Sequence, residues 1–253
     1  MVMRETLDGL QGGQIRGRMI TNLRYADEII LLATSEAELQ GLVDRLDRVS
    51  RKYSLLINVD KTKVMASDGI PCRILIQNEL LEQVDTFPYF GSLITEDGEC
   101  TTEFRTRLNR VQAIEASLQK IWKSHNIPIS TKIRLMKALV WPVATYGCES
   151  WMPRKNEETH LHTFEMKGLR RIPQVLWTAK KTNEWVLNKA GVKRELLDTV
   201  KARKLTYYGH TMRKQWSCLE KEVMQGTMPG AHRRGRPRMA WLDNIKTWTG
   251  LSV

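Results

Sequence analysis

The sequence predicts an α+β fold, in which a small antiparallel sheet with one helix comes first and a mainly helical region follows. Before about residue 98, short runs of β-branched and apolar residues alternate with turn-forming residues, a pattern typical of strands. From Thr102 onward, apolar residues recur every three or four positions, as they do in amphipathic helices. The 42% hydrophobic and 27% charged residues match a globular protein with a core.

The first elements surround a polar turn. Strand-like runs at 22–24 and 29–33 flank Tyr25-Ala26-Asp27-Glu28, so we expect a hairpin with carboxylates at its tip. Ser35 and Glu38 then form a capping box for a helix. The apolar face of this helix consists of Leu39, Leu42, Val43, Leu46 and Val49.

The chain then returns to short strands before it turns helical. Leu55–Met65 has strand character around a turn at 60–62, and Ile74–Ile94 offers short strands split at Asn78-Glu79 and at Phe87-Pro88. Three later helices are expected to begin at the N-caps Ser130, Asn156 and Thr182. Pro142 should kink or interrupt the first of these helices, because proline removes a backbone donor.

Positive charge and tryptophan concentrate in the later part of the chain. Residues 1–150 carry 19 Lys/Arg and 19 Asp/Glu, whereas residues 151–253 carry 21 and 9, so the whole net charge of +12 arises there. All eight tryptophans lie beyond position 120. Clustered basic residues predict contact with a polyanion such as RNA or DNA, and a solvated basic surface over buried tryptophans is the alternative.

The composition also indicates in which kind of cellular compartment the protein is expected. The four cysteines form no C-x-x-C pair, which predicts free thiols in a reducing, intracellular compartment. No apolar run approaches the roughly 20 residues that span a bilayer, and no signal peptide opens the chain. We therefore expect neither a membrane partner nor secretion.

Several phrases in a fixed order resemble the reverse transcriptases of non-long-terminal-repeat retrotransposons, the long interspersed element type. The resemblance covers nearly the whole chain from Arg16. The phrases are Asn22–Asp27, Ile57-Asn58 with Lys61–Met65, Phe90–Thr95, Tyr146–Trp151, Gly209-His210, and Gly235–Arg238 ahead of Trp241–Asp243. The resemblance implies a partial polymerase palm in residues 1–98, with the family's motifs C, D and E. It also implies a thumb-like helical region in 99–152 and a basic, Trp-rich helical region in 153–253.

The resemblance assigns ancestral roles to individual residues. Asp27 matches the first motif C aspartate, which binds both catalytic magnesium ions, and Glu28 occupies the place of the second aspartate. Lys61 resembles the motif D lysine, which assists the leaving pyrophosphate. Residues 87–94 resemble the motif E hairpin, which holds the primer end.

The same comparison predicts that the isolated chain is not a polymerase. Only 26 residues precede Asp27, too few for the upstream aspartate strand (motif A), the motif B loop and the fingers. Two-metal chemistry needs carboxylates on both sides of an ion pair, and one hairpin supplies one side. Retention of magnesium is therefore not expected.

Nucleic-acid contact is assigned to two basic groups. Arg234-Gly235-Arg236-Pro237 resembles the core of an AT-hook, whose arginines enter narrow A·T minor grooves. The candidates are Arg233, Arg234, Arg236 and Arg238 in this segment and Lys201, Arg203 and Lys204 in a basic helical stretch. Most of the tryptophans, at helical spacing, are expected to lie in the core.

Three interpretations stay open at this point. The first is a retrotransposon-derived fragment that keeps sequence-independent binding of RNA or DNA. The second is a polymerase part that works only with another polypeptide supplying the fingers and motif A. The third is a relic without selected function, or a helical protein-interaction module. A palm cut through its sheet should also expose a strand edge near 22–24 or 29–32.

Overall fold

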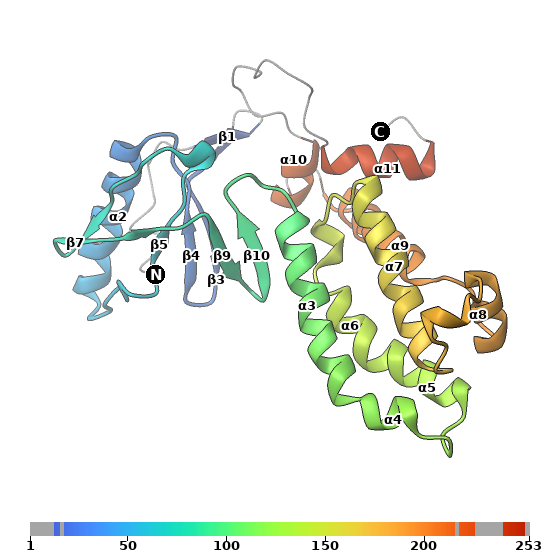
Figure 1. The fold of residues 1–253 in the computed structure, drawn as a ribbon. Coiled ribbons are helices and arrows are strands. Elements are labelled where there is room, and N and C mark those ends of the chain that lie inside the picture. Colours follow the sequence, from blue (N-terminus) through green and yellow to red (C-terminus); the bar gives the residue numbers. More distant parts are fainter. Residues whose placement is uncertain (1–12, 16–17, 216–217, 226–239, 251–253) are drawn as a thin grey trace. The chain divides into compact units, whose positions relative to one another are not determined.

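The computed structural model describes residues 13–15, 18–215, 218–225 and 240–250, and it confirms the α+β prediction (Figure 1). These residues form two compact units. Unit 1 draws on Met1–Pro88, Thr95–Gly98 and Lys214–Pro237, and unit 2 draws on Tyr89–Ile94, Glu99–Arg213 and Arg238–Val253. Small two-stranded sheets occupy the early part of the chain, and the remainder is mainly helical.

Two-stranded sheets dominate unit 1. Its strands are β1 Gly13–Ile15, β2 Arg18–Ile20, β3 Asn22–Tyr25, β4 Glu28–Leu31, β5 Lys63–Val64, β6 Leu75–Ile76, β7 Glu79–Leu80, β8 Glu82–Gln83, and most of β9 Thr86–Tyr89. The pairs β1–β2, β3–β4 and β6–β7 are antiparallel, whereas β5 and β8 are parallel. Two short helices, η1 Ser67–Gly69 and α10 Leu219–Gln225, complete the unit.

Helix α2, Glu36–Lys52, packs against β4 and β6. Its start confirms the predicted cap, because Ser35 Oγ accepts the Glu38 amide at 3.2 Å. The Glu38 carboxylate accepts from Thr34 N and Oγ1, each at 2.8 Å, and so fixes the approach to the helix. Val43 joins Val64, Ile74, Ile76 and Leu81 in a small core. The amide of Gln40 adds two bonds to the backbone of Leu75, at 2.8 and 2.9 Å.

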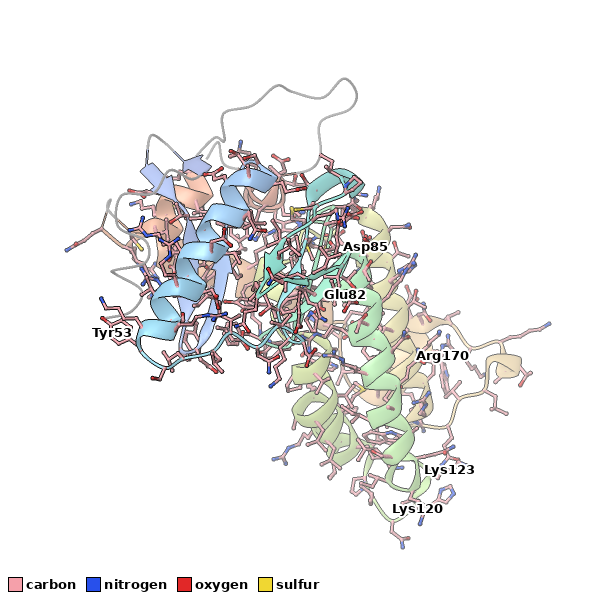
Figure 2. All side chains as sticks on the ribbon, turned by 90° about the vertical axis from the view of Figure 1, so that its left-hand side faces the viewer. Tyr53, Glu82, Asp85, Lys120, Lys123 and Arg170 are labelled. Carbon is pink, nitrogen blue, oxygen red and sulfur yellow. The ribbon has the colours of Figure 1, made fainter. Side chains whose placement is uncertain are left out.

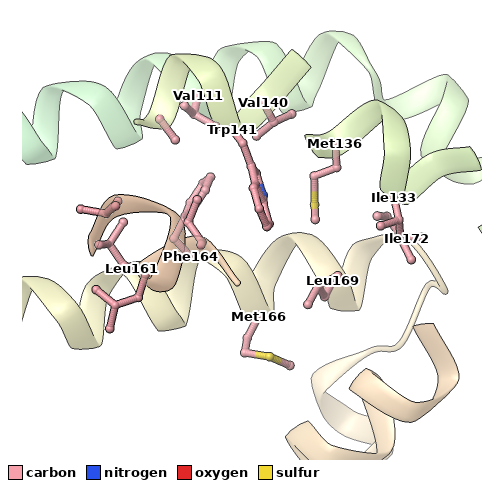
Figure 3. Close-up of a cluster of buried hydrophobic side chains, with 14 of the residues drawn as sticks. Val111, Ile133, Met136, Val140, Trp141, Leu161, Phe164, Met166, Leu169 and Ile172 are labelled. Carbon is pink, nitrogen blue, oxygen red and sulfur yellow. The ribbon is translucent and has the colours of Figure 1, made fainter. Parts of the chain in front are cut away.

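Unit 2 is a helical assembly around one large core. Its helices are α3 Thr101–Ser117, α4 Gln119–Lys123, α5 Ile129–Leu135, η2 Met136–Val140, α6 Trp141–Ala144, η3 Cys148–Ser150, α7 Lys155–Arg171, η4 Trp177–Ala179, α8 Asn183–Ala190, α9 Leu196–Met212 and α11 Trp241–Thr249. Buried side chains from α3, α6 and α7, among them Val111, Trp141 and Phe164, lie in this core (Figure 3). Residues 99–152 and 153–213 therefore share a single hydrophobic interior.

Proline positions and helix starts differ in part from the sequence-based expectations. The predicted interruption at Pro142 is confirmed, since a π-helical turn, η2, directly precedes the proline-bearing α6. Thr182 caps α8 as predicted and accepts the Trp185 amide at 3.2 Å. The caps predicted at Ser130 and Asn156 were wrong, because α5 begins at Ile129 and α7 at Lys155.

The predicted strand break at Phe87-Pro88 was also wrong. Both residues lie inside β9, which pairs with β10, Ser92–Thr95. A two-stranded ribbon tolerates proline wherever the missing amide would point to an outer edge. The chain instead turns at Phe90 and Gly91, whose φ angles are 46° and 77°.

The prediction that most tryptophans lie in the core holds for three of the six whose side chains the structure describes. Trp122, Trp141 and Trp151 are buried, whereas Trp241 and Trp248 are half-buried and Trp185 is exposed. Among the helices of the described residues, none combines the length and the apolar character needed to cross a bilayer.

Candidate functional site

The predicted carboxylate hairpin is present. Strands β3 and β4 pair with Tyr25 opposite Glu28, so Ala26 and Asp27 form a two-residue turn. Ala26 has a φ of 51°, a region that costs a residue with a Cβ some strain. Asp27 lies in the turn and Glu28 begins β4, and both side chains are exposed. The hairpin thus presents two adjacent carboxylates to solvent.

Two adjacent carboxylates do not fit a two-metal site. Such a site clamps ions about 4 Å apart with ligands on both sides. Among the residues the structure describes, no group of three or more His, Cys, Asp or Glu side chains is placed to hold a metal ion. Asp27 and Glu28 therefore do not make a complete ligand set within the described residues.

Lys61 lies in a tight turn ahead of β5. Its backbone amide donates to Asn58 Oδ1, three residues earlier in the chain, at 3.0 Å, and its side chain is exposed. Asn58 also accepts bonds at its carbonyl from Thr62 N, at 3.1 Å, and from Thr62 Oγ1, at 2.7 Å. The turn is well defined, and it leaves the Lys61 ammonium in solvent.

The tip of the β9–β10 hairpin is held by a buried ion pair of unit 2. Arg107 Nε lies 2.6 Å from Glu103 Oε1, and both side chains are about 95% buried. The Arg107 guanidinium also donates to the carbonyl of Gly91, while Glu103 Oε2 accepts the Leu93 amide at 2.8 Å. This one charged pair therefore provides hydrogen-bond partners for the Gly91 carbonyl and for the Leu93 amide.

Tyr146 supports the same turn and also contacts Arg107. Its hydroxyl donates to the carbonyl of Phe90 at 2.9 Å, and its ring lies under the Arg107 guanidinium at 4.7 Å. A Cβ added to Gly91 would meet this ring at 3.5 Å, in a backbone region that already disfavours side chains. The Phe90 ring is held in an exposed position, 43% accessible.

The basic candidates on α9 have structural partners. Arg203 is exposed, but its guanidinium donates to the carbonyl and the hydroxyl of Thr145, at 3.1 and 2.8 Å. Lys201 lies 3.8 Å from Glu158 and over the ring of Trp248. Positions 233, 234, 236 and 238, where the other candidate arginines stand, are outside the described residues.

Lys204 is fully buried. Its ammonium donates to the carbonyl of Trp151 at 2.7 Å and to Asn244 Oδ1 at 2.9 Å. The rings of Trp241 and Trp248 lie 4.4 and 5.6 Å from Nζ. Burial lowers the pKa of Lys204 to about 7, whereas the two oxygens and the rings favour the charged form. A side chain with no solvent exposure cannot contact a phosphate, so Lys204 does not belong to a nucleic-acid-binding surface in this fold.

Other lysines, which the sequence interpretation did not single out, lie on the surface of unit 2. Lys120, Lys123, Lys180, Lys181 and Lys189 are exposed and form no ion pair with a described residue. Trp185, 39% accessible, lies beside Lys181, whose Nζ is 5.3 Å from the ring centre. The pattern Lys180-Lys181 with a tryptophan four residues beyond Lys181 is the signal that could have identified them.

Comparison with known proteins gives one distant match. The chain is 28% identical over 250 residues to an uncharacterized transposon-derived protein of Caenorhabditis elegans, a match that covers 92% of this chain and 86% of the relative. No family model matches the chain. No solved structure matches it significantly.

Proposed function

We propose that the chain is a remnant of a retrotransposon reverse transcriptase that binds RNA or DNA without sequence preference. The transposon-derived relative supports this origin, since the similarity extends over 92% of the chain. The order of the motif-like phrases supports the more specific assignment. In this proposal residues 1–98 derive from a palm, 99–152 from a thumb and 153–253 from a basic terminal region.

The observation that carries the binding function is the one-sided charge of the chain. Residues 151–253 hold 21 Lys/Arg against 9 Asp/Glu, while residues 1–150 are neutral in sum. Phosphate contacts by lysine and arginine supply most of the affinity of non-specific nucleic-acid binding. Such contacts carry no sequence information, which fits a protein that retains binding without a template-directed reaction.

Catalysis by the isolated chain is not part of the proposal. Polymerisation by attack of a 3′-hydroxyl on a nucleoside triphosphate needs ions held from both sides. Asp27 and Glu28 come from one hairpin, and the described residues supply no third ligand beside them. Glu28 also carries one methylene more than the aspartate it replaces.

Titration with labelled nucleic acids tests the proposal. An RNA–DNA hybrid, duplex DNA and single-stranded RNA are each titrated with the full chain at two salt concentrations, with and without magnesium. We expect affinity that falls steeply with salt and does not depend on magnesium. Absence of binding at low salt would reject the proposal in favour of a relic or a protein-interaction module.

A second candidate function is a polymerase completed by another polypeptide. The observation that favours it is the β3–β4 ribbon, because no other strand of the described residues pairs with either outer edge. A strand from a second chain carrying the missing aspartate could extend this sheet. Primer extension with and without a polypeptide that contains the fingers and motif A tests this candidate, and activity only in the mixture would establish it.

A further inference from the structure

The C-terminal end of α7 brings two basic segments together. Gln174 Nε2 donates to the carbonyl of Lys123 at 3.0 Å, which ties the residues after α7 to the end of α4. Arg170 donates to the carbonyl of Lys181 at 2.8 Å and to Asn183 Oδ1 at 2.9 Å, which ties α7 to the start of α8. The end of α4 and the start of α8 therefore flank the same helix end.

These segments hold more than half of the net charge of the chain. Residues 118–127 and 171–194 contain eight Lys/Arg and one acidic residue, Glu184, a difference of +7 against +12 for the whole chain. Arg171 is compensated by Glu115, at 2.6 Å. The remaining basic residues are Lys120, Lys123, Lys180, Lys181, Lys189, Lys193 and Arg194. Lys120 and Lys123 project from α4 into solvent (Figure 2).

The indole of Trp185 is exposed near these lysines, on a helical turn that its neighbours hold in place. Thr182 caps the first turn of α8 through the amide of Trp185, and the neighbouring Val186 is fully buried. Trp185 itself is 39% accessible and carries the Lys181 ammonium beside its ring. An aromatic ring fixed among lysines is the arrangement by which proteins stack unpaired bases while neutralising their phosphates.

We propose that Lys120, Lys123, Lys180, Lys181 and Trp185, here called the α4–α8 surface, bind single-stranded nucleic acid. Trp185 stacks on an unpaired base, and the four lysines contact the phosphates on either side of it. The inference rests on the proposed nucleic-acid binding and specifies its place and its ligand. It differs from the sequence-based candidates on α9, whose side chains are bound within the protein.

Single strands suit this surface better than duplexes do, because bases in a duplex are already stacked and present only their edges. An anionic membrane is the competing ligand, since lysines beside Trp185 and the 71% accessible Leu176 also suit a lipid interface. Bases and lipids differ in one testable respect. Stacking needs the aromatic plane of Trp185, whereas membrane insertion needs its apolar bulk.

The test uses the full chain and three variants. Lys123→Gln/Lys180→Gln/Lys181→Gln removes three charges from the surface, and Arg105→Gln/Lys155→Gln/Lys246→Gln removes three from exposed positions elsewhere in unit 2. Trp185→Leu removes the aromatic plane and keeps apolar bulk. Binding is measured to a labelled uridine 20-mer, to a 20-base-pair duplex and to vesicles of phosphatidylserine and phosphatidylcholine. Circular dichroism verifies that each variant is folded.

For the uridine 20-mer, we expect roughly tenfold weaker binding by the surface triple variant than by the control triple. We also expect Trp185→Leu to weaken binding about tenfold to the single strand and less than twofold to the duplex. Equal loss in the two triple variants, while the unmodified chain binds, would overturn the surface and leave the proposed function standing. Vesicle binding that depends on the surface lysines, without such dependence for the single strand, would assign the surface to membranes. Failure of the unmodified chain to bind any nucleic acid would reject the proposed function itself.

Discussion

Lys204 Nζ on α9 donates a 2.9 Å hydrogen bond to Asn244 Oδ1 on α11, and so joins two helices 40 residues apart in the sequence. Asn244 in turn donates to the carbonyl of Pro153 at 3.0 Å, and Trp241 Nε1 donates to the carbonyl of Glu149 at 2.9 Å. The last described helix is therefore fixed through polar atoms to η3 and to the segment that joins η3 to α7. Lys204 is the centre of this arrangement, and no carboxylate of the described residues pairs with it.

Stability should depend on pH through Lys204. Its folded pKa is lowered to about 7 by burial, while an unfolded lysine has a pKa of about 10.4. Between these values the unfolded chain binds more protons, so the free energy of unfolding rises with pH. From pH 7 to 8.5 we expect Lys204 to add roughly 1–2 kcal/mol, as measured by urea unfolding.

Lys204→Met is the control for this pH dependence. The variant should lose the rise between pH 7 and 8.5, whatever its absolute stability. Measurements stop at pH 8.5 because burial raises the pKa of Cys148 to about 11, which makes stability fall as the unfolded thiol ionises near pH 9. Parallel pH profiles for the two proteins would show that Lys204 stays charged in the folded state.

The buried pair Glu103–Arg107 should contribute strongly to stability. Arg107→Met leaves the Glu103 carboxylate buried with its charge unmatched and removes a donor to the Gly91 carbonyl. We expect a loss of about 3 kcal/mol in unfolding free energy. Arg105→Gln, on the exposed face of the same helix, should change it by less than about 0.5 kcal/mol. If Arg107→Met lowered the unfolding free energy as little as Arg105→Gln is expected to, the pair would contribute little to stability.

The local sequence pattern predicted the order of helices, strands and turns better than it predicted which of them contact one another in the fold. The carboxylate hairpin, the Ser35 cap and the interruption near Pro142 follow from residues adjacent in sequence, and all three are present. The break at Phe87-Pro88 was misplaced because the turn at Phe90 depends on Arg107 and Tyr146, which are distant in sequence.

The candidate site shows the same limit. Lys204 reads as a surface lysine in a basic helix, and only the fold reveals that Trp151 and Asn244 surround it. Lys120 and Lys123 read as ordinary helix lysines, and only the contact between Gln174 and Lys123 places them beside the start of α8. Charge composition indicated the part of the chain that contains Lys180 and Lys181, but it did not show which lysines are exposed and which, like Lys204, are buried.

The β3–β4 ribbon should exchange its outer amides rapidly. Thr21 accepts the Leu32 amide at 2.8 Å, so Leu23 and Ile30 are also a hydrogen-bonded pair by the alternation of an antiparallel ladder. The amides of Arg24 and Ile29 then point to outer edges, where no strand of the described residues pairs with them. Hydrogen exchange should be slower at Leu23 and Ile30 than at Arg24 and Ile29. Uniform strong protection in a monomer would contradict this open-edge arrangement.

Asp27→Asn should leave nucleic-acid affinity within about twofold of the unmodified chain, both with and without magnesium. The Asp27 side chain is exposed, and the described residues provide no third carboxylate with which it could hold an ion. Removal of one negative charge should, if anything, favour a polyanion slightly. Glu28→Gln is the matched variant on the adjacent residue, and both are measured by fluorescence anisotropy with the RNA–DNA hybrid. Binding that requires magnesium and is lost in Asp27→Asn would mean that the hairpin still coordinates a metal, and the polymerase completed by a second chain would then become the leading interpretation.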